Sequence, residues 1–129
     1  MRMVRNSIFA GGLTLLSTLG LSSEVLAAGD AAKGADVYKR CAICHNAENG
    51  GGNRIGPNLF GVVGRPAGSV AGYSYSSAMK NSGITWTNDV LAEYVTNPKK
   101  KVPGDKMSFP GLSDTNQIAD LIAYLDTLK

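Results

Sequence analysis

Apolar positions recur at helical spacing in the last part of this chain. The residues concerned are Ile118, Leu121, Ile122, Leu125 and Leu128. They lie three or four positions apart, so they share one face of a helix. Ser113 or Asp114 precedes them and is a favourable N-cap. The pattern predicts a C-terminal helix that buries this face in the core.

Two further stretches predict helices earlier in the chain. Asp30 is a suitable cap for a short N-terminal helix, and apolar or small residues follow it at helical spacing. These are Gly34, Val37, Tyr38 and Cys41. Another helix begins at Thr87 or Asn88 and must end near Pro98. Its apolar positions are Val90, Leu91, Tyr94 and Val95.

The remainder of the chain reads mainly as loop. A short helical turn is expected around residues 76–81, ending at Gly83, and no run of alternating apolar and polar residues predicts a strand. The segment NPKKKVPGDKMSFPG contains Pro98, Pro103 and Pro110 and has no periodicity. A loop of this length in a small domain is usually functional. We therefore expect an all-α fold of three main helices, short helical turns and long loops.

The first 27 residues have the pattern of a secretory signal peptide. Arg2 and Arg5 precede an apolar run from Ile8 to Leu21, and small residues end at Ala27. The run is too short and too polar for a membrane span, which needs about 20 apolar residues. We expect cleavage after Ala27, one mature domain over residues 28–129, and a location in the periplasm.

The composition of residues 28–129 argues against nucleic-acid binding. This part has 102 residues, of which 11 are basic and 9 are acidic, so its net charge is +2. Nucleic-acid binding requires a larger and more continuous basic excess. A chain of this length also has little room for a hydrophobic core, so a bound group could supplement it.

The segment CAICH contains both cysteines and the only histidine, namely Cys41, Cys44 and His45. Four interpretations compete. A zinc site needs a fourth ligand, and no other cysteine or histidine exists. A redox dithiol belongs beside a βαβ unit, which the pattern does not predict. A plain disulfide explains the thiols alone, whereas c-type haem attachment explains the thiols and the histidine.

The haem interpretation requires the second axial ligand to be found. Met79 and Met107 are the methionines of residues 28–129. Met79 belongs to the short helical turn and is expected to pack in the core. Met107 lies in the proline-rich loop and has no helical face to fill, so it is the better ligand beside His45.

Five ordered segments, CAICH, GPNLFGVVGR, GYSYSSAMKNSGITW, EYVTNPKKKVPGDKM and DLIAYL, resemble class I cytochrome c, both the mitochondrial protein and bacterial cytochromes of the c2 type. The resemblance covers residues 29–128. It implies that the terminal helices cross near Gly34, Tyr38, Leu121 and Tyr124, around one covalently bound haem c.

The resemblance also implies roles for residues near the haem. Pro57 would accept a hydrogen bond from His45, and the Tyr94 hydroxyl would lie near the ligating sulfur. Arg65, Tyr75 and Trp86 would bind the haem propionates. At two positions the chain departs from the mitochondrial pattern: Asp105 replaces a threonine, and Met79 replaces an asparagine. We expect Asp105 either to face a propionate, with a raised pKa, or to turn outward into solvent.

An iron with two axial ligands has no open position, so one-electron transfer is the expected function and catalysis is not. The alternatives are a gas or peroxide site exposed by dissociation of Met107, and a thiol oxidoreductase that uses Cys41 and Cys44. The expected partners are acidic redox proteins such as a cytochrome bc complex, a terminal oxidase or a photosynthetic reaction centre. We expect a monomer without a stable membrane anchor.

Basic residues near the expected ligands suggest where such partners dock. They are Arg40, Arg54, Lys99, Lys100, Lys101 and Lys106. These six residues carry a charge of +6, whereas the net charge of residues 28–129 is +2. The other residues of this part therefore carry a net charge of −4. The simple alternative is a solvated basic face, but the resulting dipole would steer an acidic partner toward the haem.

Overall fold

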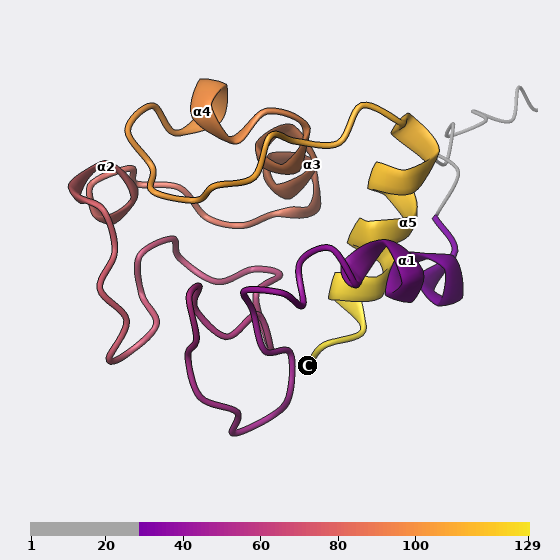
Figure 1. The fold of residues 1–129 in the computed structure, drawn as a ribbon, viewed down its shortest axis with the longest axis horizontal. Helices are drawn as coiled ribbons and strands as arrows, with labels where there is room; N and C mark the ends of the chain where they lie inside the picture. The colour runs from indigo at the N-terminus through magenta and orange to yellow at the C-terminus, as the bar shows by residue number, and fades with distance from the viewer. Residues whose placement is uncertain (1–28) are drawn as a thin grey trace, which may run out of the picture.

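The computed structural model describes residues 29–129 (Figure 1), so the expected signal peptide lies outside the described residues. Five helices are present in this part: α1 Ala31–Tyr38, α2 Ser77–Lys80, α3 Asn88–Thr96, α4 Pro98–Lys101 and α5 Thr115–Asp126. The three main helices and the short turn expected from the sequence are confirmed. Extended pairing within residues 29–129 is limited to one isolated bridge between Pro66 and Thr85.

Polar side chains fix where the main helices begin. Asp30 accepts a hydrogen bond from the Lys33 N–H, and Thr87 accepts one from the Val90 N–H. Asp114, the second of the two candidates, caps α5. Each of these bonds satisfies a backbone N–H that has no partner inside its helix.

Helix α4 was not expected, because the sequence around it was interpreted as irregular loop. It is a single turn in which Asn97 accepts from the Lys100 N–H and Pro98 occupies the first turn. Proline is tolerated there because its missing N–H would have no intrahelical partner. The short turn is therefore specified by a cap and a proline rather than by periodicity.

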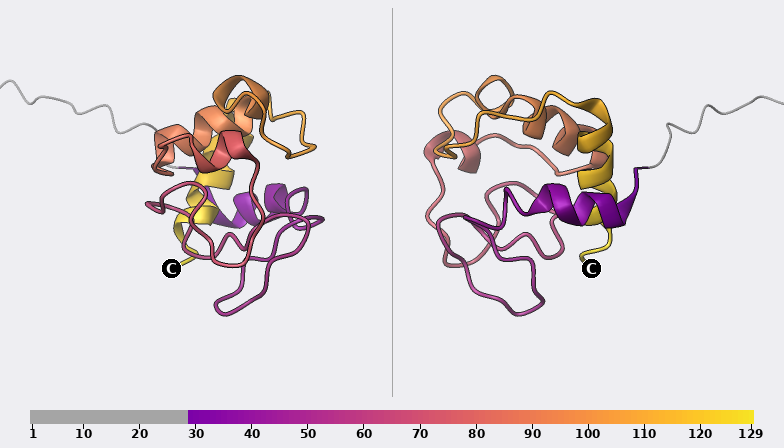
Figure 2. Two further views of the ribbon diagram at one scale, coloured as in Figure 1. Left: turned by 90° about the vertical axis from the view of Figure 1, so that its left-hand side faces the viewer. Right: turned by 45° about the vertical axis from the view of Figure 1, so that its right-hand side comes forward.

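Helices α1 and α5 cross in close contact, as the right-hand view of Figure 2 shows. A Cβ atom added to Gly34 would lie 1.9 Å from the Asp120 carbonyl oxygen. The rings of Tyr38 and Tyr124 pack beside this point with centroids 5.1 Å apart. Only a glycine permits so close an approach of the two backbones, and the expected crossing is confirmed.

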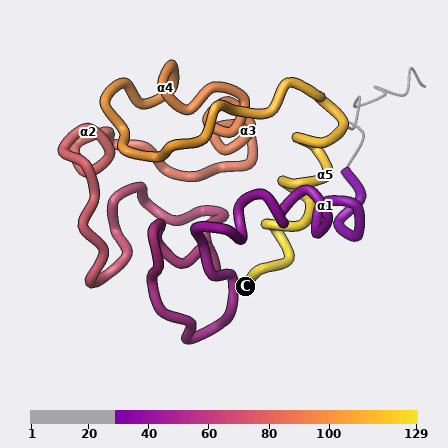
Figure 3. The backbone as a smooth tube through the Cα atoms, viewed as in Figure 1, coloured from indigo at the N-terminus to yellow at the C-terminus, as the bar shows by residue number. Residues whose placement is uncertain are grey.

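The core lies between α1, α3 and α5 and extends to the loops. Its buried residues are Tyr38, Val62, Met79, Trp86, Leu91, Tyr94, Val95, Val102, Leu112, Ile118, Leu121, Ile122 and Leu125. All the predicted apolar positions of α5 are among them except Leu128, which lies beyond the helix and is partly buried. In Figure 3 the segment after α1 occupies the lower half of the view, and the segment from α4 to α5 runs through the upper half.

Candidate functional site

The Cys-Ala-Ile-Cys-His segment forms a turn directly after α1. The N–H of Cys41 donates to the Tyr38 carbonyl at 2.7 Å. The N–H groups of Cys44 and His45 both donate to the Cys41 carbonyl, at 3.0 and 2.9 Å. These bonds continue the helix by one irregular turn and bring two thiols and an imidazole together on a short piece of backbone.

The Cys41 thiol is partly buried and is not joined to Cys44 in a disulfide. Both cysteines are free. Burial raises the pKa of the Cys41 thiol to about 11, although the nearby Arg40 charge opposes this. Reactive dithiols have a lowered pKa because the thiolate is the nucleophile. Cys41 therefore lacks the lowered pKa that is typical of an attacking thiol.

His45 is held by the segment that follows it. Its Nδ1 lies 2.7 Å from the carbonyl oxygen of Pro57. A carbonyl can only accept, so Nδ1 carries the proton and Nε2 has a free lone pair. Burial lowers the pKa of His45, which favours the neutral imidazole. A neutral ring with a fixed tautomer is the form that binds a metal.

Gly56 makes room for this ring, a role that the sequence analysis missed. A Cβ at Gly56 would lie 2.2 Å from Cε1 of His45. Any side chain here would therefore collide with the imidazole. The signal was available as the glycine that precedes Pro57, but one sequence does not show which glycines contact a ring.

Arg54, which was expected to contribute to a docking surface, also has a structural role. Its guanidinium donates to the carbonyls of Ala42 and Ile43, at 2.7 and 3.2 Å. These two residues separate the cysteines. Arg54 therefore holds the loop between the thiols in place while its side chain remains exposed.

Met107 lies in the segment between α4 and α5 and is half-buried. The hydroxyl of Tyr94 on α3 is 3.9 Å from its sulfur. Met79, in contrast, is 9% exposed and belongs to the core. The structure thus gives the two methionines different surroundings, and Met79 packs as expected.

Asp105 does not turn into solvent, and that alternative is wrong. It is 6% exposed. The Tyr94 hydroxyl donates to its Oδ2 at 2.5 Å, and the ammonium of Lys99 lies 2.5 Å from its Oδ1. A buried carboxylate is retained in this way because hydrogen bonds and an opposite charge offset its desolvation.

The residues expected around a haem are placed as follows. Trp86 is buried and packs against Tyr94 with ring centroids 4.9 Å apart. The backbone N–H of Trp86 donates to the Arg65 carbonyl at 2.9 Å. The Arg65 guanidinium donates to the Phe60 carbonyl at 3.1 Å, and burial lowers the Arg65 pKa. The hydroxyl of Tyr75 accepts from the Val70 N–H at 3.0 Å.

The six basic residues do not form one uniform free surface. Besides Arg54, three of them have side-chain contacts: Lys99 pairs with Asp105, Lys101 with Glu93, and Lys106 bonds to the Ser74 carbonyl. Lys106 also lies 4.6 Å from the centre of the Tyr73 ring. Arg40 and Lys100 are exposed and make no side-chain hydrogen bond or ion pair with residues 29–129.

None of the helices in the described part of the chain is long and apolar enough to span a membrane. The fold and the site together define a small all-α protein of the c-type haem class. Its cysteine pair and histidine have the CxxCH spacing, consistent with covalent haem c.

Comparison with known proteins identifies the family. The cytochrome c family model matches residues 31–129, so the chain belongs to the cytochrome c family. The chain is 48% identical to cytochrome c2 of Blastochloris viridis over 85% of its own length and 87% of that protein. It is 55% identical to cytochrome c of Gibberella zeae over 78% of its length and 95% of that protein.

A solved structure agrees with this assignment. Cytochrome cH from Methylobacterium extorquens matches with a TM-score of 0.73 and 50% identity, over 77% of this chain and 99% of that one. The expected resemblance, all-α fold and haem c class are confirmed. The protein is an electron carrier of the cytochrome c family and not an enzyme.

Proposed function

We propose that the protein carries single electrons on one haem c, attached through thioether bonds to Cys41 and Cys44 and ligated by His45 and Met107. When bound, the haem supplies an iron that alternates between two oxidation states. The observation that carries the ligand assignment is the fixed tautomer of His45, whose Nδ1–H is taken by Pro57 and whose Nε2 is free.

The surroundings of these residues fit a haem. Gly56 leaves space that a Cβ would fill beside the His45 ring, and Arg54 fixes the backbone between the two thiols. Met107 lies in the segment between α4 and α5, with its sulfur 3.9 Å from the Tyr94 hydroxyl. The proposed set of residues therefore comprises two thiols for attachment, a nitrogen and a thioether.

The chain's own residues determine how the carrier behaves. His45 and Met107 would keep one geometry in both oxidation states, which lowers the structural change needed for electron transfer. A thioether ligand and a buried setting both favour the reduced state, so they raise the reduction potential. Trp86, Tyr94, Arg65 and Tyr75 are proposed to line the haem environment.

Docking is proposed to use the basic residues Arg40, Arg54, Lys99, Lys100, Lys101 and Lys106. Arg40 and Lys100 support this proposal best, because they are exposed and free of side-chain partners within residues 29–129. The proposed partners are acidic faces of membrane redox complexes, either respiratory or photosynthetic. An N-terminal signal peptide and thioether attachment both suit the periplasm, where we place the monomeric carrier.

Spectroscopy of the purified protein tests this function. We expect covalently retained haem, a six-coordinate low-spin spectrum in both oxidation states, and slow binding of carbon monoxide by the reduced form. Rapid binding of carbon monoxide would instead support a gas sensor. A colourless native protein would contradict the proposal.

A further inference from the structure

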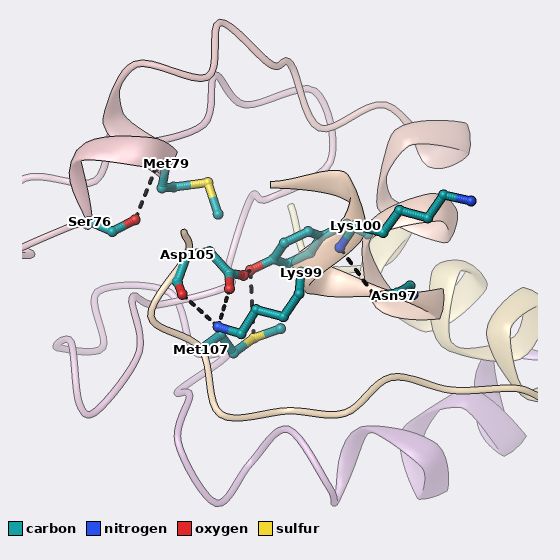
Figure 4. Close-up of polar contacts among 8 residues, drawn as sticks. Ser76, Met79, Asn97, Lys99, Lys100, Asp105 and Met107 are labelled. Carbon is teal, nitrogen blue, oxygen red and sulfur yellow. Dashed lines mark hydrogen bonds and ion pairs between the residues drawn. The ribbon is translucent and has the colours of Figure 1, made fainter. Parts of the chain in front are cut away.

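A buried carboxylate lies two positions before Met107 and belongs neither to the ligands nor to the thioether attachment. The Asp105 side chain is 1% exposed, whereas that of its partner Lys99 is 56% exposed. Both carboxylate oxygens are used, since Oδ2 accepts from Tyr94 and Oδ1 from Lys99. Figure 4 shows the Lys99 side chain reaching Asp105, with Met79 and Met107 on either side.

The network joins three separate segments. Tyr94 belongs to α3, Lys99 to α4, and Asp105 to the irregular segment that follows. The ammonium of Lys99 contacts the main-chain oxygen of Asp105 as well as Oδ1, both at 2.5 Å. The Asp105 N–H donates to the Val102 carbonyl at 3.0 Å. Side chain and backbone of Asp105 are thus both tied to neighbouring helical turns.

Asp105 also determines where the Tyr94 hydroxyl proton goes. The hydroxyl lies 2.5 Å from Oδ2 of Asp105 but 3.9 Å from the sulfur of Met107. A carboxylate is a stronger acceptor than a thioether, and a charge-assisted bond is shorter and stronger than a neutral one. The Tyr94 hydroxyl therefore donates its hydrogen bond to Asp105, and the lone pairs of the Met107 sulfur stay available.

We propose that Asp105 is a positioning residue for Met107: its pair with Lys99 holds the segment between α4 and α5 closed, and its bond with Tyr94 leaves the sulfur free to bind iron. This inference rests on the proposed ligation by Met107. It assigns Lys99 an internal role, in addition to any role in docking. Removing one partner of a buried pair costs more than the pair itself contributes, because the other charge is left unpaired.

The test uses the haem-loaded protein and three changes: Lys99→Met, Asp105→Asn and both together. Carbon monoxide reaches the reduced iron only when the Met107 segment opens, so its binding rate reports the opening. We expect each single change to raise this rate about tenfold, a moderate value because Lys99 is largely exposed. Hydrogen exchange at the amide of residue 105 should accelerate in the Lys99→Met protein.

Two further variants separate positioning from a general loss of charge or stability. Lys80→Met removes an exposed lysine of α2 that makes no side-chain hydrogen bond or ion pair with residues 29–129, and its rate should match the unchanged protein. Lys99→Arg keeps the cation and should bring the rate closer to that of the unchanged protein than Lys99→Met does. The double variant should open no faster than the more affected single variant, because both changes break one interaction.

Several outcomes would overturn the inference. These are a Lys99→Met rate equal to that of Lys80→Met, an Arg variant that behaves like the Met variant, or fully additive effects in the double variant. If Asp105→Asn does not fold, the comparison of Lys99→Met with Lys99→Arg still decides. Met107→Ala distinguishes the two proposals: if it binds carbon monoxide no faster than the unchanged protein, the ligand assignment itself fails.

Discussion

His45 donates its Nδ1–H to the carbonyl of Pro57 across 2.7 Å, and the residue before that proline is the one that makes room for the ring. The hydrogen bond fixes the tautomer, and Gly56 fixes the position. The two residues act together because they are neighbours in one loop that passes the imidazole.

Gly56→Ala should displace the imidazole, because the new Cβ would lie 2.2 Å from Cε1 of His45. Residues that orient a metal-binding histidine typically contribute 10- to 100-fold to metal affinity, so we expect about tenfold less low-spin haem protein. The measurement is the visible spectrum of equal amounts of purified chain. Gly52→Ala is the control, since a Cβ there meets nothing within 4 Å; equal spectra for both variants would contradict the role of Gly56.

Met107→Ala should remove an axial ligand while the haem stays attached. The reduction potential should fall, since the thioether favours the reduced state, and carbon monoxide should bind rapidly. Met79→Leu is the matched control: it conserves volume in the core and should cost less than about 1.5 kcal/mol of unfolding free energy. An unchanged spectrum in the Met107 variant would show that another group is the ligand.

Replacement of both Cys41 and Cys44 by alanine should release the haem. In the unchanged protein the haem should remain with the polypeptide through acid–organic extraction. The double variant should also lose much of its unfolding free energy, because the 102 residues after the expected cleavage point have little other core. Haem that extracts freely from the unchanged protein would refute thioether attachment.

Gly34→Ala should destabilise the crossing of α1 and α5. The added Cβ would meet the Asp120 carbonyl at 1.9 Å, and this backbone atom cannot move away cheaply. Overpacking of this kind costs about 2–3 kcal/mol, measurable by denaturant unfolding. Gly52→Ala should stay within about 0.5 kcal/mol of the unchanged protein.

Arg40→Glu and Lys100→Glu together should slow electron transfer to an acidic partner by about threefold or more at low salt. The dependence of the rate on ionic strength should flatten, because fewer exposed charges remain to be screened. Lys99 and Lys106 are less suitable for this test, since both have internal contacts. Lys33→Glu, in the first turn of α1, changes the net charge by the same amount as Arg40→Glu or Lys100→Glu alone. Equal slowing in Lys33→Glu and in these single variants would mean that no specific basic surface exists.

Features of this protein that depend on near neighbours in the chain could be predicted from its amino-acid order. The apolar face of α5 follows from the spacing of its apolar residues. Asp30, Thr87 and Asp114 each accept a hydrogen bond from a backbone N–H two or three residues later in the chain. The attachment segment is equally local, because two thiols and the next side chain are presented by consecutive residues. Helix α4 escaped prediction because one turn is too short to show a period.

Contacts between residues far apart in the chain, in contrast, depend on the folded arrangement of the helices and loops. Arg54 reaches the carbonyls of Ala42 and Ile43, and Asp105 finds both Tyr94 and Lys99 on different helices. From the sequence, Asp105 was expected to face a propionate or solvent. No local sequence pattern shows whether a lysine will pair with a given carboxylate in the folded protein. Desolvation, which makes a buried carboxylate stable only with its partners in place, acts on the assembled chain and leaves no periodic signal in the order of residues.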